Sequence, residues 1–350
     1  MSYEDNIKKV TPYVPGEQPA GDVIKLNTNE SPFPPSMHVA MAIASIDYDS
    51  LRLYPDPDAT VLVQAIADYY KVDEEQVFVG VGSDDVLAMA FQTFFNSDKP
   101  ILFPDTTYSF YKVWAALYDI PYEEIPLKDD FTIDTLDYQK ENGGVIFANP
   151  NAPTGVELPL NEVEEIIKAN PDSVVIVDEA YIDFGNASAL SLVDKYENLL
   201  VVRTFSKSRA LAGMRVGYAI GSAKLIKALK DVKFSTNSYT LNLAAIRAGV
   251  AALGDDEYFD TIVSQIKDTR EDTRRKLEQM GFECLKSSTN FLFVKHGDVP
   301  AKDIFEKLRE KDIYVRYFDL PRIDEYLRIT IGNNEQMNSL MLALEEIVGN

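Results

Sequence analysis

Between about residue 60 and residue 250, stretches with helically spaced apolar residues alternate with short runs that are apolar throughout. Apolar residues three and four positions apart predict helices at 60–70, 86–95 and 161–169, the last with Asn161 as its cap. The apolar runs, which are rich in β-branched residues, predict strands buried on both faces. These runs are residues 77–79, 101–103, 145–148, 174–177, 199–202 and 216–220. Strands separated by helices predict an α/β fold with a doubly wound, mostly parallel sheet.

The two ends of the chain do not follow this alternation. The first 35 residues are rich in proline and polar groups, which predicts an extended arm with a short strand at 23–26. After about residue 255, a long charged helix (258–280) precedes a shorter α+β pattern. Its strands are expected at 290–294, 313–316 and 326–331, and its helices at 301–311 and 335–347. We therefore expect an N-terminal arm (1–40) that packs with the small domain, a large domain (41–255) and a small C-terminal domain (256–350).

The chain is strongly acidic. Its 350 residues include 56 acidic and 34 basic side chains, which gives a formal net charge of −22. A nucleic acid or an anionic membrane would be repelled by this charge, so neither is expected as a partner. A small anionic substrate must then be held by a few arginines against the overall field.

Cysteine and histidine are scarce. The single Cys284 excludes an internal disulfide and every multi-cysteine metal cluster, and His38 and His296 lie far apart without suggestive neighbours. No metal site is therefore expected. The acidic N-terminus does not resemble a signal peptide, and no run of 18 apolar residues is present, so a cytoplasmic protein is expected.

Five short segments at predicted strand ends carry the candidate chemistry. Residues 80–85 (GVGSDD) join a strand to a helix, where glycines and free N–H groups suit either an anion or a plain tight turn. Tyr108 follows the next strand and could stack on a planar ring or simply pack in the core. Residues 149–155 (NPNAPTG) form a rigid loop whose asparagines can direct amides at a ligand oxygen.

The remaining two segments bring charged groups to the same sheet edge. Asp178 directly follows the 174–177 run, and a carboxylate there needs a cation or a protonated ring nitrogen as partner. Lys207 follows the 199–202 run, and Arg215 comes eight residues later. Open α/β sheets bind their ligands at the carboxyl ends of the strands, and a guanidinium there suits a phosphate. A lysine, a carboxylate, an aromatic ring and a loop suited to an anion are together the parts of a pyridoxal 5′-phosphate site.

The whole set resembles, nearly end to end, the fold-type I aminotransferases, and most closely the histidinol-phosphate aminotransferases. Each motif is weak alone, and the resemblance depends on all of them in this order. The motifs are Thr11-Pro12-Tyr13, Asn29-Glu30-Ser31-Pro32, Leu53-Tyr54-Pro55-Asp56, Gly82-Ser83-Asp84, Asn151-Ala152-Pro153-Thr154-Gly155, Asp178-Glu179-Ala180-Tyr181, Ser206-Lys207 with Arg215, and Leu327-Arg328-Ile329-Thr330-Ile331-Gly332.

The resemblance implies a role for each matching residue. Lys207 would form a Schiff base with pyridoxal 5′-phosphate, and Asp178 would keep the pyridine nitrogen protonated. Tyr181 would hydrogen-bond the phenolic oxygen of the ring, and Tyr108 would stack on its face. The phosphate would be held by the backbone of Ser83 and Asp84, by Ser206 and Arg215, and by Tyr54 from the neighbouring subunit of a homodimer. The anionic end of the substrate would be bound by Arg328, helped by Arg316 and Tyr13.

The chain departs from the family pattern at one position. An asparagine usually stands just before Pro153 and contacts the ring oxygen, whereas this chain has Ala152. Either Asn151 takes over that contact, which we expect, or Tyr181 bears it alone.

The resemblance implies transfer of an amino group from histidinol phosphate to 2-oxoglutarate, yielding imidazole-acetol phosphate and glutamate in histidine biosynthesis. Lys207, released from the cofactor, would move the substrate Cα proton. Two other enzymes share these motifs, an aromatic amino acid aminotransferase and a threonine-phosphate decarboxylase. A cofactor-binding regulator would share them too, but the chain has no basic helix-turn-helix extension.

Overall fold

The larger of the two main sheets has seven strands, in the order β2-β8-β7-β6-β5-β3-β4, in the computed structural model, which describes residues 2–349. Strands β7, β6, β5, β3 and β4 run parallel, whereas β8 is antiparallel to both of its neighbours. The bounds are β2 (Val77–Gly80), β3 (Ile101–Pro104), β4 (Tyr122–Ile125), β5 (Gly144–Ala148), β6 (Val175–Asp178), β7 (Leu199–Thr204) and β8 (Gly217–Gly221). The predicted α/β fold with a mostly parallel sheet is confirmed.

Helices cover both faces of this sheet because successive side chains of a strand point to opposite faces. Val175 and Val177 enter one core, and Ile176 between them enters the other. The first core contains side chains of α2 (Thr60–Tyr70), α5 (Leu160–Ala169) and α7 (Leu243–Leu253). The second contains side chains of α3 (Ser83–Phe94), α4 (Phe110–Leu117) and α6 (Ala223–Thr236). A further helix, α1 (Met37–Ala44), packs beside α7.

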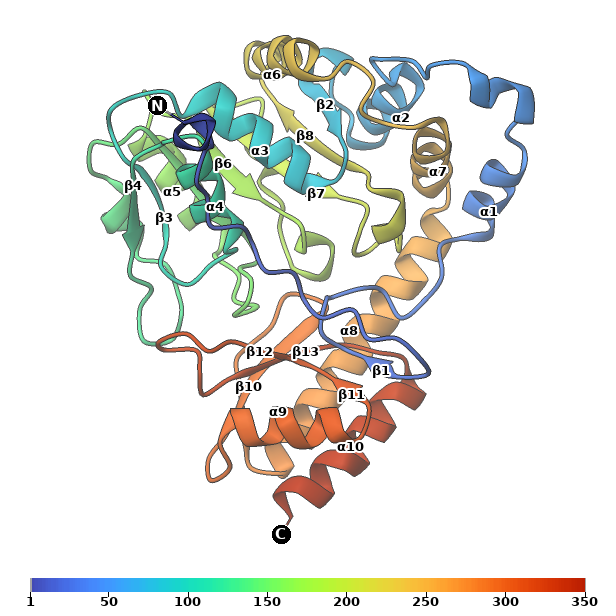
Figure 1. Cartoon of the computed structure of the whole chain (residues 1–350), viewed down its shortest axis with the longest axis vertical. Helices are drawn as coiled ribbons and strands as arrows, with labels where there is room; N and C mark the ends of the chain where they lie inside the picture. The colour runs from blue at the N-terminus through green and yellow to red at the C-terminus, as the bar shows by residue number, and fades with distance from the viewer. Residues whose placement is uncertain (1, 350) are drawn as a thin grey trace.

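A second α/β unit lies below the large sheet in Figure 1, and α8 (Asp256–Gln279) runs down into it. Its antiparallel sheet has the order β12-β13-β10-β9, and its core includes side chains of α8, α9 and α10. The bounds are β9 (Phe282–Cys284), β10 (Phe291–His296), β12 (Arg316–Tyr317), β13 (Leu327–Thr330), α9 (Ala301–Glu310) and α10 (Asn334–Val348). The N-terminal segment joins this unit, since β1 (Ile24–Lys25) pairs in parallel with β11 (Ile313–Tyr314). The proposed domain boundaries stay a prediction.

Two local predictions were wrong. The single strand expected at 313–316 is divided between two sheets, because the chain changes partner at the buried Val315, pairing first with β1 and then with β13. Asn161 does not cap α5, because the helix already begins at Leu160 and Pro159 stands at its N-cap without a side-chain hydrogen bond.

One edge of the large sheet gathers the candidate residues. The carboxyl ends of β3, β5, β6 and β7 meet there because these strands are parallel. The antiparallel β8 reverses direction, so its amino end reaches the same edge, and β2 beyond it again points its carboxyl end there. The loop after β2 and the residues that precede β8 therefore lie at the same edge as the loops after β6 and β7.

Candidate active site

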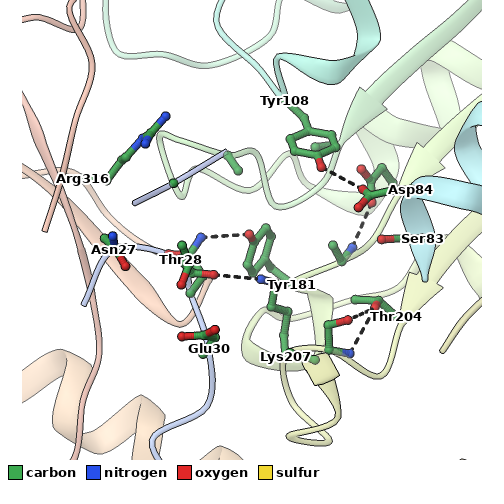
Figure 2. A pocket seen from close by; sticks show the side chains of 18 of the residues that line it. Asn27, Thr28, Glu30, Ser83, Asp84, Tyr108, Tyr181, Thr204, Lys207 and Arg316 are labelled. Carbon is green, nitrogen blue, oxygen red and sulfur yellow. Dashed lines mark hydrogen bonds between the residues drawn. The ribbon is translucent and has the colours of Figure 1, made fainter. Parts of the chain in front are cut away.

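A cavity of about 390 Å³ opens at this edge, between the large sheet and the small unit. Figure 2 shows Ser83 and Asp84 at one end, Arg316 at the other, and Tyr181 and Lys207 between them. The predicted site residues that line it are Tyr13, Ser83, Asp84, Tyr108, Asp178, Tyr181, Ser206, Lys207, Arg215, Arg316 and Arg328. We call this space the central cavity.

The Ser83 end is built by close approach of two backbone segments. A Cβ added at Gly82, where φ is +83°, would lie 2.5 Å from Nη2 of Arg215. A Cβ added at Gly217 would lie 2.3 Å from the backbone nitrogen of Ser83. Glycine at both positions therefore lets Arg215 and the first N–H groups of α3 share one small space. Free N–H groups at a helix start, together with a guanidinium, make an anion site.

Asp84 and Tyr108 line the same end. The Tyr108 hydroxyl donates to Asp84 Oδ1 over 2.8 Å, and Arg215 Nη2 lies 3.4 Å from Asp84 Oδ2. The Tyr108 ring packs edge-on against Tyr111 and Trp114, and these contacts fix the orientation of its ring plane. Burial, followed by the charge of Asp84, raises the pKa of Tyr108 well above its usual value, so its hydroxyl remains a donor.

Asp178 ends β6 as a nearly fully buried carboxylate, with 4% of its surface exposed. Its two oxygens accept from the Tyr111 hydroxyl (3.0 Å) and from the backbone N–H of Ala180 (3.2 Å). Burial raises the pKa of Asp178 to about 6, against the lowering effect of these two donors. A buried carboxylate without a cation in contact is poised to pair with a cationic ligand group.

Lys207 and Tyr181 lie side by side in the middle of the central cavity. Lys207 Nζ donates to the carbonyl of Thr28 over 3.2 Å and lies 5.7 Å from the centre of the Tyr181 ring. The Tyr181 hydroxyl accepts from the side-chain amide of Asn29 over 2.9 Å. Ser206, which precedes Lys207 in the chain, is fixed through its backbone N–H, which donates to Thr204 Oγ1 over 3.1 Å.

Two arginines line the opposite end. Arg316 and Arg328 stand directly opposite each other on β12 and β13, an arrangement in which like charges destabilise a sheet. Neither forms an ion pair with a carboxylate of residues 2–349. Arg328 donates to the Asn27 carbonyl, but its buried Nε has no hydrogen-bond partner. Burial, and then the charge of Arg316, lowers the pKa of Arg328. This end therefore suits an anion.

Tyr13 also lines the cavity, and its ring stacks on Phe110 with centroids 4.1 Å apart.

Tyr54 and Asn151 do not line the cavity. Tyr54 is 80% exposed and stacks on Tyr239. Asn151 is buried, and its side-chain amide is hydrogen-bonded to the loop after β3. It donates to the Thr106 carbonyl (2.9 Å) and accepts from Thr107 Oγ1 (2.8 Å). Ala152, not Asn151, faces the central cavity.

Sequence reasoning missed two contacts. Asn29 holds the Tyr181 hydroxyl and is itself fixed by the Thr330 hydroxyl, which donates to Asn29 Oδ1 over 3.0 Å. Tyr111 donates to Asp178. Asn29 stands in the Asn29-Glu30-Ser31-Pro32 motif, which was the available signal for it, whereas Tyr111 lies outside the motifs named above.

No cluster of three or more histidine, cysteine or acidic residues with the geometry of a metal site occurs within residues 2–349. Over the same residues, no helix has the length and apolar character to cross a membrane.

Comparison with known proteins agrees with this geometry. Residues 21–344 match the family described as aminotransferase class I and II. The histidinol-phosphate aminotransferase 1 of Hydrogenovibrio crunogenus is 56% identical over 98% of this chain and 96% of its own length. The histidinol-phosphate aminotransferase of Lactococcus lactis is 50% identical over 100% of this chain and 99% of its own.

Among solved structures, the histidinol-phosphate aminotransferase of Sinorhizobium meliloti in complex with pyridoxal 5′-phosphate superposes with a TM-score of 0.86 at 26% identity. It covers 93% of this chain, which covers 91% of that one. The chain therefore belongs to the pyridoxal-phosphate-dependent class I and II aminotransferases and, within them, to the histidinol-phosphate aminotransferase family.

Proposed function

We propose that this aminotransferase binds pyridoxal 5′-phosphate in the central cavity and transfers an amino group between histidinol phosphate and 2-oxoglutarate. The observation that carries the proposal is a cavity with an anion site at each end and a lysine between them. One end has Arg215 and the start of α3, and the other has Arg316 and Arg328, neither of which forms an ion pair within residues 2–349. A phosphate on the cofactor and a phosphate on the substrate account for both ends.

The residues fit pyridoxal 5′-phosphate. Gly82 and Gly217 let Arg215 and the start of α3 approach one another, since a side chain at either position would collide with the guanidinium or the backbone. Asp178 offers a buried carboxylate to a protonated ring nitrogen, and Lys207 offers a primary amine. Ser206 and Tyr108 would complete the cofactor end, and Tyr181 would hydrogen-bond the ring oxygen. Because its amide is occupied by Thr106 and Thr107, Asn151 is not assigned a cofactor contact.

Bound cofactor supplies an electron sink for the negative charge that develops at the substrate Cα. The chain supplies the proton handling and the positioning. Lys207 Nζ would accept the substrate Cα proton as a general base and later donate it as a general acid. Asp178 would pair as a carboxylate with the ring nitrogen, and the Asn29 amide holds the Tyr181 hydroxyl in a fixed orientation. Tyr108 would stack on one face of the bound ring.

A half-reaction assay tests this function. Histidinol phosphate added to the cofactor-loaded enzyme should bleach the visible cofactor absorbance, and 2-oxoglutarate should restore it. Phenylalanine should react at least 100-fold more slowly as judged by kcat/KM, an expectation based on the loss of an ion-paired phosphate. Faster reaction with phenylalanine would favour an aromatic amino acid aminotransferase, and carbon dioxide release from threonine phosphate would favour the decarboxylase.

Arg328→Gln should lower kcat/KM for histidinol phosphate by roughly 100-fold, because a charge-assisted contact to the substrate phosphate is lost in a partly buried site. Stopped-flow bleaching against substrate concentration measures this. Arg322→Gln is the matched control, since Arg322 is also an arginine of the small unit but pairs with Asp105 outside the central cavity. Equal losses in both variants would remove Arg328 from the substrate site.

We also propose that the active form is a homodimer. A cluster of large apolar side chains is exposed on one part of the chain, which is unusual for a monomer unless a partner covers it. The cluster consists of Met37 (71%), Met41 (60%), Tyr48 (86%), Leu51 (63%), Leu53 (59%) and Tyr54 (80%). A second copy of the chain over this surface would bring Tyr54 to the neighbouring cofactor phosphate.

Tyr54→Phe should then weaken cofactor binding about tenfold, because one hydrogen bond to a charged phosphate is lost. Equilibrium dialysis of pyridoxal 5′-phosphate measures the change, and Tyr48→Phe in the same exposed segment is the control. A monomeric elution volume at working concentration, with full activity, would contradict the dimer.

A further inference from the structure

A buried ion network lies outside the lining of the central cavity. Arg203 on β7, with 6% of its side chain exposed, forms a close ion pair with Asp183. Its Nη1 donates to the Tyr70 hydroxyl over 2.8 Å, and its Nε lies 3.8 Å from Glu179 Oε2. None of these four residues lines the cavity, so none contacts a ligand there. Buried charges are costly unless geometry compensates them, which makes this cluster a defined part of the fold.

The network is interleaved with the proposed reactive residues along the chain. Glu179 directly follows Asp178, and Asp183 follows Tyr181 by two positions. Arg203 precedes Lys207 by four. The Asp178 and Arg203 segments are adjacent strands, in which Asp178 pairs with Val202. Each reactive side chain therefore faces the cavity while a close neighbour in the chain joins the network.

Glu179 anchors the network to the rest of the large unit. Its carboxylate accepts from the Ser188 hydroxyl and from the backbone N–H of Ala189, both over 2.6 Å. Burial raises the pKa of Glu179 to about 7, and the charge of Arg203 opposes this rise. Two short hydrogen bonds and a nearby guanidinium leave this carboxylate little freedom to move.

One hydrogen bond links the network to the reactive lysine. Ser208, which immediately follows Lys207 and is 2% exposed, donates its hydroxyl to Asp183 Oδ2 over 2.5 Å. The same carboxylate receives Arg203 on its other oxygen. Asp183 thus connects the peptide that carries Lys207 to Arg203 on β7. Through Arg203 it is also linked to Glu179.

We propose that Asp183, Arg203 and Ser208 are positioning residues, and that the Ser208–Asp183 bond fixes where the Lys207 amine lies in the cavity. This inference rests on the proposed role of Lys207 as the reactive amine. None of the three would touch cofactor or substrate. Their loss should therefore affect the reaction far more than substrate binding.

Ser208→Ala removes the link with the smallest change in volume. We expect kcat to fall roughly tenfold, and roughly 100-fold in Asp183→Asn, since small displacements of a reacting group have effects of this size. KM for both substrates should stay within about twofold, because neither anion site is altered. Ser173→Ala is the matched control. It also loses one serine hydrogen bond, to the Asn142 carbonyl at the opposite end of β6, and should leave kcat unchanged.

A second readout does not depend on turnover. In the full-length chain freed of cofactor, the acetylation rate of Lys207 by acetic anhydride, followed by mass spectrometry, should rise at least threefold in Ser208→Ala and not in Ser173→Ala. If the enzyme fails to use histidinol phosphate, this rate still reports on positioning, so the two proposals fail separately.

A double-mutant cycle separates a positioning role from a general loss of packing. If Ser208 acts through Asp183, the double variant should have nearly the same kcat as Asp183→Asn alone. Additive losses in kcat, or identical Lys207 acetylation rates in Ser208→Ala and Ser173→Ala, would overturn the proposal. Should Asp183→Asn fail to fold, the Ser208→Ala comparison still decides it.

Discussion

Replacing Lys207 with alanine is expected to abolish turnover, a loss of roughly four orders of magnitude or more, together with the visible absorbance of the lysine–cofactor link. Lys207 is the one lysine lining the central cavity over residues 2–349, so no second amine stands ready to replace it. It would both attach the cofactor and move the Cα proton, and one substitution removes both roles.

The chain should nonetheless fold. Lys207 Nζ makes one hydrogen bond in this structure, to the Thr28 carbonyl, and losing it costs about 1 kcal/mol. Absorbance spectra, steady-state assays and thermal unfolding of the same preparation measure the cofactor link, the turnover and the stability. Lys207→Arg should be equally inactive, because a guanidinium keeps the charge but is too basic to act as a nucleophile or base. Lys227→Ala, in a side chain 75% exposed, is the control. Turnover in Lys207→Ala would refute the assignment.

Asp178 and Lys207 could be predicted from sequence because each follows an apolar, β-branched run. A parallel sheet brings the ends of such runs to one edge, so local pattern sufficed to bring the two together. The position of Arg215 could not be predicted from local pattern alone, because β8 must be antiparallel for its amino end to reach that edge. The order of motifs supplied that information through resemblance.

Contacts that depend on strand order and packing could not be predicted. Tyr111 reaches Asp178 because α4 packs over β3 and β5, and nothing local to residue 111 indicates this. The partners of Arg203 likewise depend on the register of β6 against β7. Helix α7 (Leu243–Leu253) is apolar on nearly every side and has no polar face whose period could reveal it.

Asp178→Asn should lower kcat by roughly 100- to 1000-fold, the range expected when one preorganised charge that stabilises the transition state is removed. The carboxylate that keeps a ring nitrogen protonated becomes a neutral amide, so the electron sink weakens. Binding of the cofactor phosphate, at the other end of the site, should change much less. Steady-state kinetics and equilibrium dialysis on one preparation separate these two effects.

The same substitution should stabilise the chain freed of cofactor at neutral pH. Burial raises the pKa of Asp178 from 3.8 to about 6, so the folded chain binds this proton more tightly than the unfolded chain does. The resulting stability is fully present below pH 3.8 and is lost as pH rises through 6. At pH 8 the ionised side chain therefore costs up to about 3 kcal/mol. Asparagine can accept from the Ala180 N–H and donate to Tyr111, so it avoids this cost.

Urea unfolding of the cofactor-free chain between pH 5 and pH 8.5 tests this prediction. The free energy of unfolding of Asp178→Asn should exceed that of the parent by about 1–3 kcal/mol at pH 8, and the gain should shrink as pH falls. Asp130→Asn is the opposite control, because hydrogen bonds from Thr132 lower the pKa of that exposed carboxylate and its loss should destabilise the chain at pH 8. A gain independent of pH would mean that packing, not the buried charge, is responsible. The expected result instead identifies Asp178 as a carboxylate whose charge costs stability in the empty cavity and becomes useful when a cationic ring nitrogen pairs with it.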